Sequence, residues 1–389
     1  MVRRVVVIVL DSLGAGHAPD AAAYGDEGAN TLVNMSRVVP GGLRVPHLQA
    51  LGLGGVTAEE IVGCPRVERP LGSYGRLIER SAGKDTMTGH WEMVGIVTRE
   101  PFPTFPGGFP QEMMEEWATF VGVEGWLHNG VASGTEIIAR LGEAHVRTGL
   151  PIVYTSADSV FQIAAHEKYF GLERLYAICE RTREFLNPHR VARVIARPFV
   201  GEDRTTFRRT GNRRDYSLSP PEPHALTQIR DGGYGVTGIG KIYDIFAGSG
   251  ITRALRTHSN REGMEILGEE LRTGRPGMYF VNLVDFDMLY GHRRDALGYA
   301  RALSEFDEQL GEVLGVLDEG DVLIITADHG LDPTWHGTDH TRETVPFLVY
   351  HPGSEGIELG VREGFCDVGA TACYALGVQV INGRPVIVG

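Results

Sequence analysis

The sequence predicts an α/β fold: a mostly parallel sheet flanked by helices, with a smaller α/β unit inserted into the chain. Short apolar runs bounded by turn residues recur at both ends of the chain, and amphipathic helical stretches lie between them. Two segments rich in proline and glycine, at 100–110 and 211–223, interrupt this alternation in the middle. The outer parts of the chain are therefore expected to form one sheet, and the middle part a unit of its own.

The apolar runs have the composition of strands that are buried on both faces. Residues 5–10 are continuously apolar, and they stop at the turn sequence DSLG. Similar runs occur at 278–286, 321–326 and 345–352. In 297–317, apolar residues recur at helical spacing with charges between them, which indicates an amphipathic helix that packs on a sheet. Strands that alternate with helices favour a parallel sheet.

The segment between the two breaks has enough elements for a compact α/β unit. Its patterns predict two helices and two strands, in chain order a helix at 135–147, a strand at 151–159, a helix near 166–186 and a strand at 193–200. We expect residues 100–216 to form an inserted cap domain. Residues 1–99 and 217–389 would then form the discontinuous core.

Composition excludes several classes of function. A net charge of -13 argues against non-specific binding of nucleic acid or of anionic membranes, since both need a basic surface. No apolar stretch approaches the ~20 residues needed to span a membrane. The first 14 residues resemble a signal peptide only superficially, because an aspartate stands where a small cleavage residue should be. The four cysteines form no CxxC pair, as expected of buried thiols in the cytoplasm.

Acidic residues and histidines follow three of the predicted core strands. Such residues are individually ordinary as turn caps or surface groups, but open α/β sheets bind ligands beyond the carboxyl ends of their strands. Carboxylates with imidazoles suit zinc, manganese or iron(II), and two such metals can hold both the attacking and the leaving oxygen of a phosphoryl transfer. The candidates are Asp11, Asp285, Asp287, His292, Asp328, His329, His336, Asp339 and His340.

Residues 83–92, GKDTMTGHWE, have the composition of a loop that carries a nucleophile and leads into a helix. A threonine hydroxyl such as that of Thr86 attacks well only when a cation lowers its pKa. Backbone N–H groups at the helix start could receive phosphate oxygens. Thr88 and Ser12 are chemical alternatives. A purely structural interpretation is a capping box with Thr86 or Thr88 as the cap.

Seven stretches of the chain together resemble the bacterial phosphopentomutase family of the alkaline phosphatase superfamily. In order they read LDSLGAGHAPD, GKDTMTGHWEMVG, YTSADSVFQIAAHE, RVIARPFVG, VDFDMLYGHRRD, TADHGLDPTWHGTDHTRE and VPFLVY. The resemblance covers nearly the whole chain and implies an alkaline-phosphatase-like core with an inserted cap.

The resemblance also implies roles for individual residues. One metal, in this family preferably manganese, would be held by Asp287, His292 and His340. A second would be held by Asp11, Asp328 and His329, with Thr86 as the phosphorylated residue. His336 would be a nearby loop residue, and Leu331, where the family often has asparagine, should change packing only.

Five further residues are implied to face a sugar phosphate, namely Ser156, Asp158, Arg193, Arg209 and Lys241. Arginine binds phosphate bidentately, and residues 181–214 contain ten arginines, most of which would simply be solvated. The assignment of Arg209 over Arg208 depends on a local spacing that differs by one residue. Lys241 is one of only three lysines, against 34 arginines.

The activity implied by the resemblance is the interconversion of α-D-ribose 1-phosphate and D-ribose 5-phosphate, and of the 2-deoxyribose pair. It would proceed through a phosphothreonine and a 1,5-bisphosphate, with a sugar 1,5- or 1,6-bisphosphate as a possible primer. The expected partners are small sugar phosphates, and a monomer is expected. The alternatives are a metal-dependent phosphatase or phosphodiesterase on the same core, and a non-catalytic metal or phosphate sensor.

Overall fold

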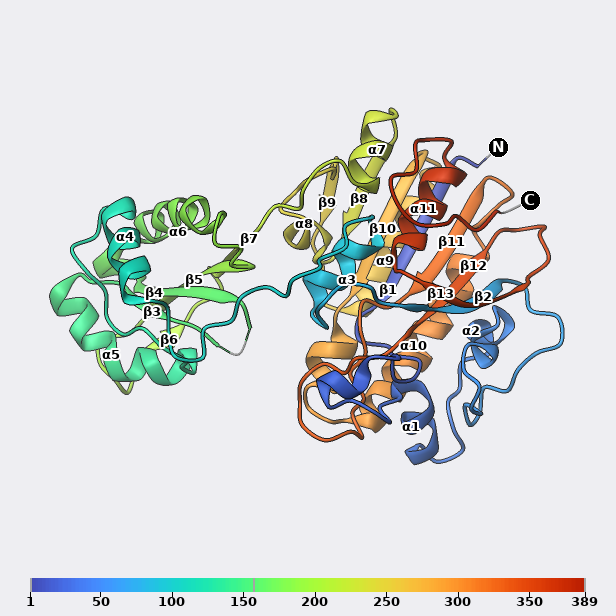
Figure 1. Cartoon of the computed structure of the whole chain (residues 1–389), viewed down its shortest axis with the longest axis horizontal. Coiled ribbons are helices and arrows are strands. Elements are labelled where there is room, and N and C mark those ends of the chain that lie inside the picture. Colours follow the sequence, from blue (N-terminus) through green and yellow to red (C-terminus); the bar gives the residue numbers. More distant parts are fainter. Residues whose placement is uncertain (1, 157, 388–389) are drawn as a thin grey trace. The chain divides into compact units, whose positions relative to one another are not determined.

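The computed structural model describes residues 2–156 and 158–387. The chain forms two compact units (Figure 1). Unit 1 consists of Met1–Glu100 and Pro220–Gly389, and unit 2 consists of Pro101–Ser219. The inserted unit thus starts one residue later and ends three residues later than the insert expected from the sequence.

Unit 1 is built on one sheet of eight strands in the order β13-β2-β12-β11-β1-β10-β8-β9. The sheet is mostly parallel, as predicted. The exception is β12, which corresponds to the predicted strand 345–352 and runs antiparallel to both of its neighbours. The strands are β1 (Arg4–Leu10), β2 (Ser73–Ile78), β8 (Gly235–Ile239), β9 (Arg253–Leu255), β10 (Gly277–Leu283), β11 (Asp321–Thr326), β12 (Val345–Tyr350) and β13 (Glu358–Glu363).

The register of the central strands determines where the functional residues lie. Strand β1 pairs in parallel with β10 on one side and β11 on the other, so that Val9 lies beside Asn282 and Thr326. Every residue of β1 is buried, as expected for a strand covered on both faces. Because the three strands end at the same level, the residues that follow them emerge at one edge of the sheet.

Two groups of helices flank this sheet. Helices α1, α2 and α9 each pack against α10. Helices α3 and α7 pack against α11, and α8 packs against α3 (Figure 1). The predicted helix 297–317 corresponds to α10, which begins at Ala296 and ends at Leu314, with Gly315 as its C-cap. The helices are α1 (Thr31–Val38), α2 (Pro46–Ala50), α3 (Thr86–Met93), α7 (Ala225–Asp231), α8 (Ile242–Ile245), α9 (Asn260–Arg272), α10 (Ala296–Leu314) and α11 (Cys366–Ala375), with short turns at η1 (Ala21–Tyr24), η2 (Leu53–Gly55) and η4 (Phe286–Gly291).

Unit 2 has its own sheet, in the order β3-β4-β5-β6, with β7 also paired to β5. Its apolar core surrounds Trp117, whose indole N–H donates to Thr182 Oγ1 at 2.9 Å. The elements are α4 (Gln111–Val121), α5 (Gly134–Thr148), β3 (Ile152–Tyr154), β4 (Val160–His166), η3 (Glu167–Gly171), α6 (Leu172–Leu186), β5 (Arg193–Val200), β6 (Arg208–Arg209) and β7 (Arg214–Ser217).

Two elements of unit 2 differ from the prediction. The predicted strand 151–159 is only the three residues of β3, and a separate strand, β4, begins at Val160. Ala157, inside the predicted strand, lies outside the described residues. The predicted helix 166–186 begins with the wider turn η3, because Gly171 takes a positive φ of 96° before α6 starts.

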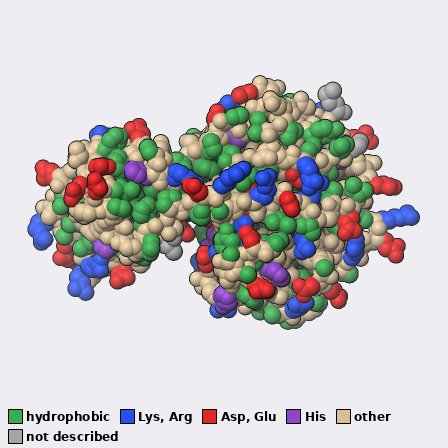
Figure 2. Space-filling model, viewed as in Figure 1, with side chains coloured by type: hydrophobic (Ala, Val, Ile, Leu, Met, Phe, Trp, Pro, Cys, Tyr) green, Lys and Arg blue, Asp and Glu red, His purple; other side chains and the backbone are tan. Residues whose placement is uncertain are grey.

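Acidic side chains lie at the surface of both units (Figure 2), and the thiols are buried as expected. Acidic side chains are spread over the visible face of both units, not gathered in one patch (Figure 2). All four cysteines are buried and unpaired. No helix within the described ranges combines the length and the apolar composition needed to cross a bilayer.

Candidate metal centre

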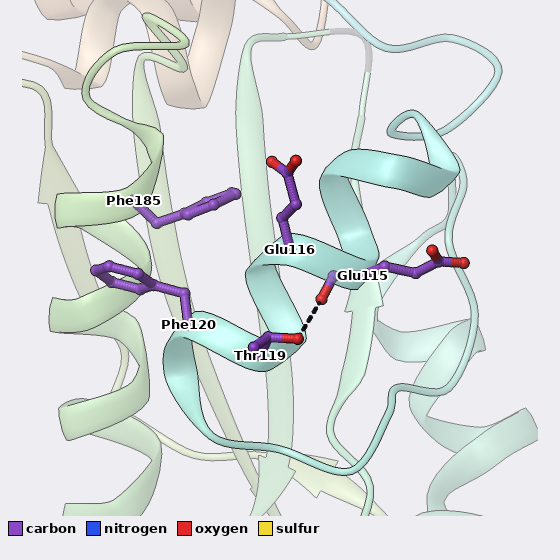
Figure 3. A pocket seen from close by; sticks show the side chains of 5 residues that line it. All are labelled: Glu115, Glu116, Thr119, Phe120 and Phe185. Carbon is purple, nitrogen blue, oxygen red and sulfur yellow. Dashed lines mark hydrogen bonds between the residues drawn. The ribbon is translucent and has the colours of Figure 1, made fainter.

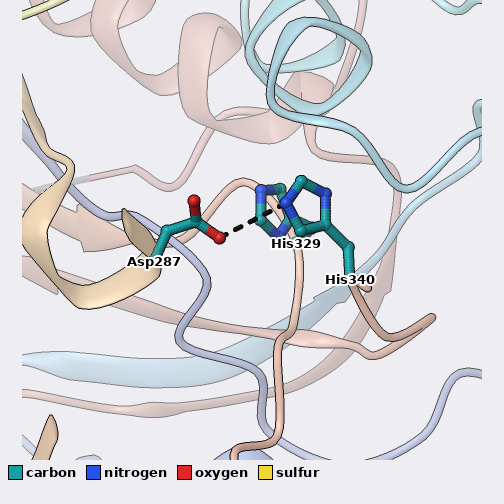
Figure 4. A group of neighbouring side chains, drawn as sticks. All are labelled: Asp287, His329 and His340. Carbon is teal, nitrogen blue, oxygen red and sulfur yellow. Dashed lines mark ion pairs between the residues drawn. The ribbon is translucent and has the colours of Figure 1, made fainter. Parts of the chain in front are cut away.

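The carboxyl edge of the central sheet brings together six of the side chains that the sequence singled out. Two groups of three residues could each hold a metal ion, because the potential ligand atoms within each group all lie within 4.8 Å of one another. His329 belongs to both groups. His292, the remaining predicted ligand, contacts one of these groups through Asp287. The groups are Asp11 with Asp328 and His329, and Asp287 with His329 and His340 (Figure 4 shows the second).

The first group is completely buried. His329 Nε2 lies 3.5 Å from Asp11 Oδ1 and 3.4 Å from Asp328 Oδ2, and none of the three side chains is more than 1% exposed. Burial raises the pKa of Asp11 well above its usual value, and the neighbouring carboxylates of Asp328 and Asp287 raise it further. The fold therefore holds negative groups together where water cannot screen them.

The second group depends on a widened helical turn. Asp287 and His292 lie in and just after η4, a π-helical turn closed by the bond from the His292 N–H to the Asp287 carbonyl at 3.0 Å. Asp287 Oδ2 lies 3.3 Å from His292 Nε2, and its Oδ1 lies 3.3 Å from His340 Nε2. Burial disfavours the charge on both partners, but their ion pair raises the pKa of His340 to about 10.

The backbone fixes how the three imidazoles are presented. Each Nδ1 faces a carbonyl oxygen and must donate to it, at 2.7 Å for His292, 3.1 Å for His329 and 2.8 Å for His340. Nε2 of each ring is thereby turned toward the carboxylates. A histidine that binds a metal through one nitrogen commonly donates its other N–H in this way.

The donor set fits a divalent cation. Within the described residues, Asp11 Oδ1, Asp287 Oδ1 and Asp328 Oδ2 are buried and accept no hydrogen bond, although an imidazole nitrogen lies 3.3–3.5 Å from each of them. Buried polar atoms are almost always hydrogen-bonded, so three carboxylate oxygens in one cluster that accept no hydrogen bond need an explanation. A cation would satisfy all three and would remove their mutual repulsion, and carboxylate oxygens with imidazole nitrogens are ligands that manganese and zinc accept.

Of the three candidate hydroxyls, that of Thr86 lies beside this cluster. Thr86 is the first residue of α3, and its Oγ1 is 3.3 Å from His329 Nε2. Thr88 Oγ1 instead donates to Asp85 Oδ2. Ser12 Oγ is fully buried against the hydroxyl of Tyr299 at 3.2 Å.

The start of α3 differs from the structural interpretation given above. The cap is Asp85, not a threonine, and its carboxylate accepts from the N–H groups of Met87 and Thr88, both at 3.1 Å. Two amides that could have received phosphate oxygens are therefore already bonded. The loop before the cap is held by the buried Arg342, which donates to the carbonyl of Gly83.

Three of the predicted substrate residues of unit 2 lie close together. A guanidinium nitrogen of Arg193 is 3.8 Å from Asp158 Oδ2, and the Asp158 N–H donates to Ser156 Oγ at 3.4 Å. Arg209 pairs with Phe199 across strands β6 and β5. Cross-strand partners share a face, and Phe199 shares its face of β5 with Arg193, so Arg209, not Arg208, lies on that face.

Lys241, the fifth predicted substrate residue, belongs to unit 1. It is exposed and follows β8 at the same edge of the sheet as the metal cluster. A shallow depression of unit 2 lies between α4 and α6, where Phe120 and Phe185 flank it together with Glu115, Glu116 and Thr119 (Figure 3). It contains none of the predicted substrate residues.

Two buried polar residues beside the cluster, His90 and Asn282, were not predicted from the sequence. Asn282 Nδ2 donates to Asp11 Oδ2 at 2.8 Å, and His90 Nδ1 lies 3.3 Å from Asp328 Oδ2. His90 stands in the segment GKDTMTGHWE, but its spacing gave it no role. A lone asparagine within an apolar strand was the available signal for Asn282. His336 is not in either metal group, and Leu331 is buried, packing beside Gly291.

Comparison with known proteins places the chain in a family. The Metalloenzyme superfamily matches residues 3–380. The phosphopentomutase of Symbiobacterium thermophilum is 58% identical over 97% of this chain and 95% of its own length. The phosphopentomutase of Syntrophotalea carbinolica is 52% identical over 98% of this chain and 97% of its own length. The PH0037 protein from Pyrococcus horikoshii shares the fold, with a TM-score of 0.51 and 14% identity over 99% of this chain and all of that one.

These matches confirm the resemblance drawn from the seven stretches of sequence. Both relatives exceed 50% identity overall, and the matched regions cover 97–98% of this chain and thus reach into both units. The alkaline-phosphatase-like α/β architecture predicted for the chain is likewise confirmed. The chain therefore belongs to the phosphopentomutase family, a family of isomerases within the metalloenzyme superfamily.

Proposed function

We propose that this protein interconverts pentose 1-phosphates and pentose 5-phosphates, of ribose and of 2-deoxyribose, by carrying a phosphoryl group on Thr86. The observation that carries the proposal is the position of the Thr86 hydroxyl. It lies at the start of α3, 3.3 Å from His329 Nε2, and His329 belongs to both candidate metal groups. The relatives that share more than half of this sequence are named phosphopentomutase.

We assign two divalent cations, preferably manganese, to the six clustered ligands. Asp11, Asp328 and His329 would hold one, and Asp287, His292 and His340 the other. When bound, such cations stabilise negative charge on the attacking and leaving oxygens and lower the pKa of a nearby hydroxyl. The remaining catalytic work is positioning by the residues of the chain.

The proposed reaction has two transfers that balance each other. In the first, the bond between Thr86 Oγ1 and phosphorus breaks, and the free hydroxyl of the bound sugar monophosphate forms a new bond to that phosphorus. The proton of the sugar hydroxyl replaces the phosphoryl group on Thr86. In the second, Thr86 Oγ1 attacks the other phosphate of the resulting 1,5-bisphosphate, and the proton returns to the sugar oxygen that leaves. A sugar 1,5- or 1,6-bisphosphate would prime Thr86.

Binding of the sugar phosphate is assigned to Ser156, Asp158, Arg193 and Arg209 of unit 2, with Lys241 of unit 1. Arg193 supports this assignment because it lies 3.8 Å from Asp158 and 3.9 Å from Asp215, beyond ordinary hydrogen-bond length. The N–H groups of its planar guanidinium can therefore bind a phosphate. We also propose that unit 2 acts as a cap that keeps water from the phosphothreonine.

Intact-mass analysis before and after treatment with a sugar 1,6-bisphosphate tests the role of Thr86. A gain of one phosphoryl group, mapped to the peptide that contains position 86, is the expected result. Thr86→Ala should lose the label and the turnover but keep two metals per chain. Thr88→Ala is the matched control, because it alters the same helical turn and should still be labelled. Label on Thr88 or Ser12 in the wild-type protein would refute the assignment.

Two further measurements separate this function from the phosphatase alternative. Coupled assays should show isomerisation of ribose 5-phosphate with little release of inorganic phosphate, whereas a phosphatase would release phosphate without isomerisation. Arg193→Ala should raise KM and leave the metal content unchanged. Loss of metal from this variant would show that Arg193 does not serve the substrate.

A further inference from the structure

His90 is a buried imidazole that the proposed reaction does not use. It lies on α3, one turn after Thr86, and is fully buried. The rings of Phe280 and Phe246 lie near it, with centroids at 6.0 Å and 6.5 Å. An imidazole in such apolar surroundings needs hydrogen-bond partners for its two nitrogens, because an unpaired buried polar atom is costly.

The partners of His90 determine which of its nitrogens carries the proton. Nδ1 lies 2.8 Å from the carbonyl oxygen of Thr86, and since a carbonyl only accepts, Nδ1 must donate. The same nitrogen is 3.3 Å from Asp328 Oδ2. In the neutral ring Nε2 is then an acceptor, and it faces the amide nitrogen of Asn282 at 3.5 Å.

Asn282 extends the chain of contacts to the neighbouring strand. It lies on β10, and its Nδ2 donates to Asp11 Oδ2 at 2.8 Å. Since Oδ2 is held by the amide, Asp11 Oδ1 is the oxygen left without a partner in the candidate metal group. The amide therefore sets which carboxylate oxygen of Asp11 is available to a cation.

Four elements of unit 1 meet through this pair of side chains. His90 connects the first turn of α3, which carries Thr86, to Asp328 after β11, and Asn282 connects the same ring to Asp11 after β1. A displacement of the ring would therefore alter the nucleophile and two carboxylates of the first metal group together. Residues that hydrogen-bond to metal ligands control their direction and the affinity for the metal.

We propose that His90 and Asn282 are positioning residues that hold Asp11, Asp328 and the Thr86 turn in the arrangement needed to bind a cation and to present the hydroxyl to it. The expected effect on catalysis rests on the proposed function. Its effect on metal binding can be measured on the protein alone. Neither residue is assigned as a ligand of the metal.

Two substitutions at His90 separate the hydrogen bond from the packing of the ring. His90→Asn retains an N–H donor near the position of Nδ1, whereas His90→Phe retains a planar ring without a donor. Titration with Mn²⁺ in a chelator-buffered solution should show an affinity about 10–100-fold weaker for His90→Phe, the usual effect of losing such a partner. His90→Asn should stay close to the wild type. In turnover assays His90→Phe should lower kcat with little change in KM.

Asn282→Leu tests the contact between Asn282 and Asp11 independently. It removes the donor to Asp11 and should also weaken Mn²⁺ binding, while circular dichroism at saturating metal confirms that the fold is retained. If His90→Phe fails to fold, His90→Gln, which keeps an amide near Nε2 but none at Nδ1, replaces it with the same expected loss of affinity.

The proposal is overturned if the variant without the Nδ1 donor binds Mn²⁺ as tightly as the wild type. It is equally overturned if His90→Asn and His90→Phe lose affinity alike, since the ring would then act by packing. Failure of the proposed function looks different. In that case the wild-type protein would not isomerise ribose 5-phosphate at all, and the difference in Mn²⁺ affinity between the variants would still appear.

Discussion

Replacing Arg4 by methionine should destabilise unit 1 by about 3–5 kcal/mol, because it leaves the carboxylate of Asp321 buried without its cation. The two side chains are 5% and 0% exposed, at the starts of β1 and β11. Arg4 Nε lies 2.5 Å from Asp321 Oδ1, and its Nη2 lies 2.6 Å from Oδ2, so the pair is bidentate. A third donor, Nη1, binds the carbonyl of Leu271.

The adjacent residue supplies a matched control. Arg3 forms an ion pair with Asp318 at 2.7 Å, but these side chains are 54% and 57% exposed. Water screens such a pair, and its contribution is about 0–1 kcal/mol. Arg3→Met and Arg4→Met therefore make the same chemical change at neighbouring positions, one in an exposed ion pair and the other in a buried pair with an additional bond to the Leu271 carbonyl.

Hydrogen exchange of the β1 amides is the assay best suited to this comparison, because exchange from a central strand reports on global opening of its unit. A loss of 3–5 kcal/mol corresponds to exchange about 10²–10⁴ times faster, since each 1.4 kcal/mol is a factor of ten. The double variant Arg4→Met/Asp321→Asn should recover part of the loss, because it removes the isolated charge. If Arg3→Met and Arg4→Met accelerate exchange equally, the argument from burial is wrong.

Three further predictions concern pH, metal and thiols. Burial lowers the pKa of His224 to about 4, so the folded ring stays neutral while the unfolded chain binds a proton as pH falls from 6.5 toward 4. Between pH 7.5 and 5 the unfolding free energy should therefore drop about 2 kcal/mol more than in His224→Gln, as measured by urea titration. Chelation should abolish turnover and lower the melting temperature, and Mn²⁺ at 100 times the Kd of a site should restore about 2.7 kcal/mol for each site, as thermal-shift measurements can check. An unchanged melting temperature would count against the metal centre. Burial raises the pKa of Cys64, Cys366 and Cys373 to about 12, so iodoacetamide at pH 8 should label no cysteine until urea is added, as mass spectrometry can check.

The position of the candidate site could be predicted because it follows from the sheet. A continuous apolar run such as residues 5–10 indicates a strand buried on both faces, and parallel strands end at a common edge. The register of β1 with β10 and β11 brings Asp11 and Asp328 to that edge as expected. Their roles as metal ligands remain predictions that the mutational and metal-binding experiments test.

Strand direction, helix capping and long-range hydrogen bonds depend on tertiary contacts, and these cannot be inferred from the pattern of apolar and polar residues. An apolar run has no direction, so the antiparallel course of β12 could not be read from residues 345–352. The purely structural interpretation of residues 83–92 would make a threonine the cap of α3, whereas Asp85 stands directly before the helix and accepts two amide protons. The role of Asn282 depends on Asp11, which is 271 residues away in the chain.

The arrangement of the first metal group has a consequence for stability as well as for chemistry. Burial and the neighbouring carboxylates both raise the pKa of Asp11, so bringing this group together without a cation opposes folding. The fully buried strand β1, paired in register on both sides, provides the rigidity that holds Asp11 there nevertheless. Neutralising this charge, for example by Asp11→Asn, should therefore stabilise the chelated protein while weakening its affinity for Mn²⁺. If Asp11→Asn instead destabilises the metal-free protein, the carboxylates of Asp11, Asp287 and Asp328 do not repel one another enough to oppose folding. The electrostatic argument for a cation site would then fail.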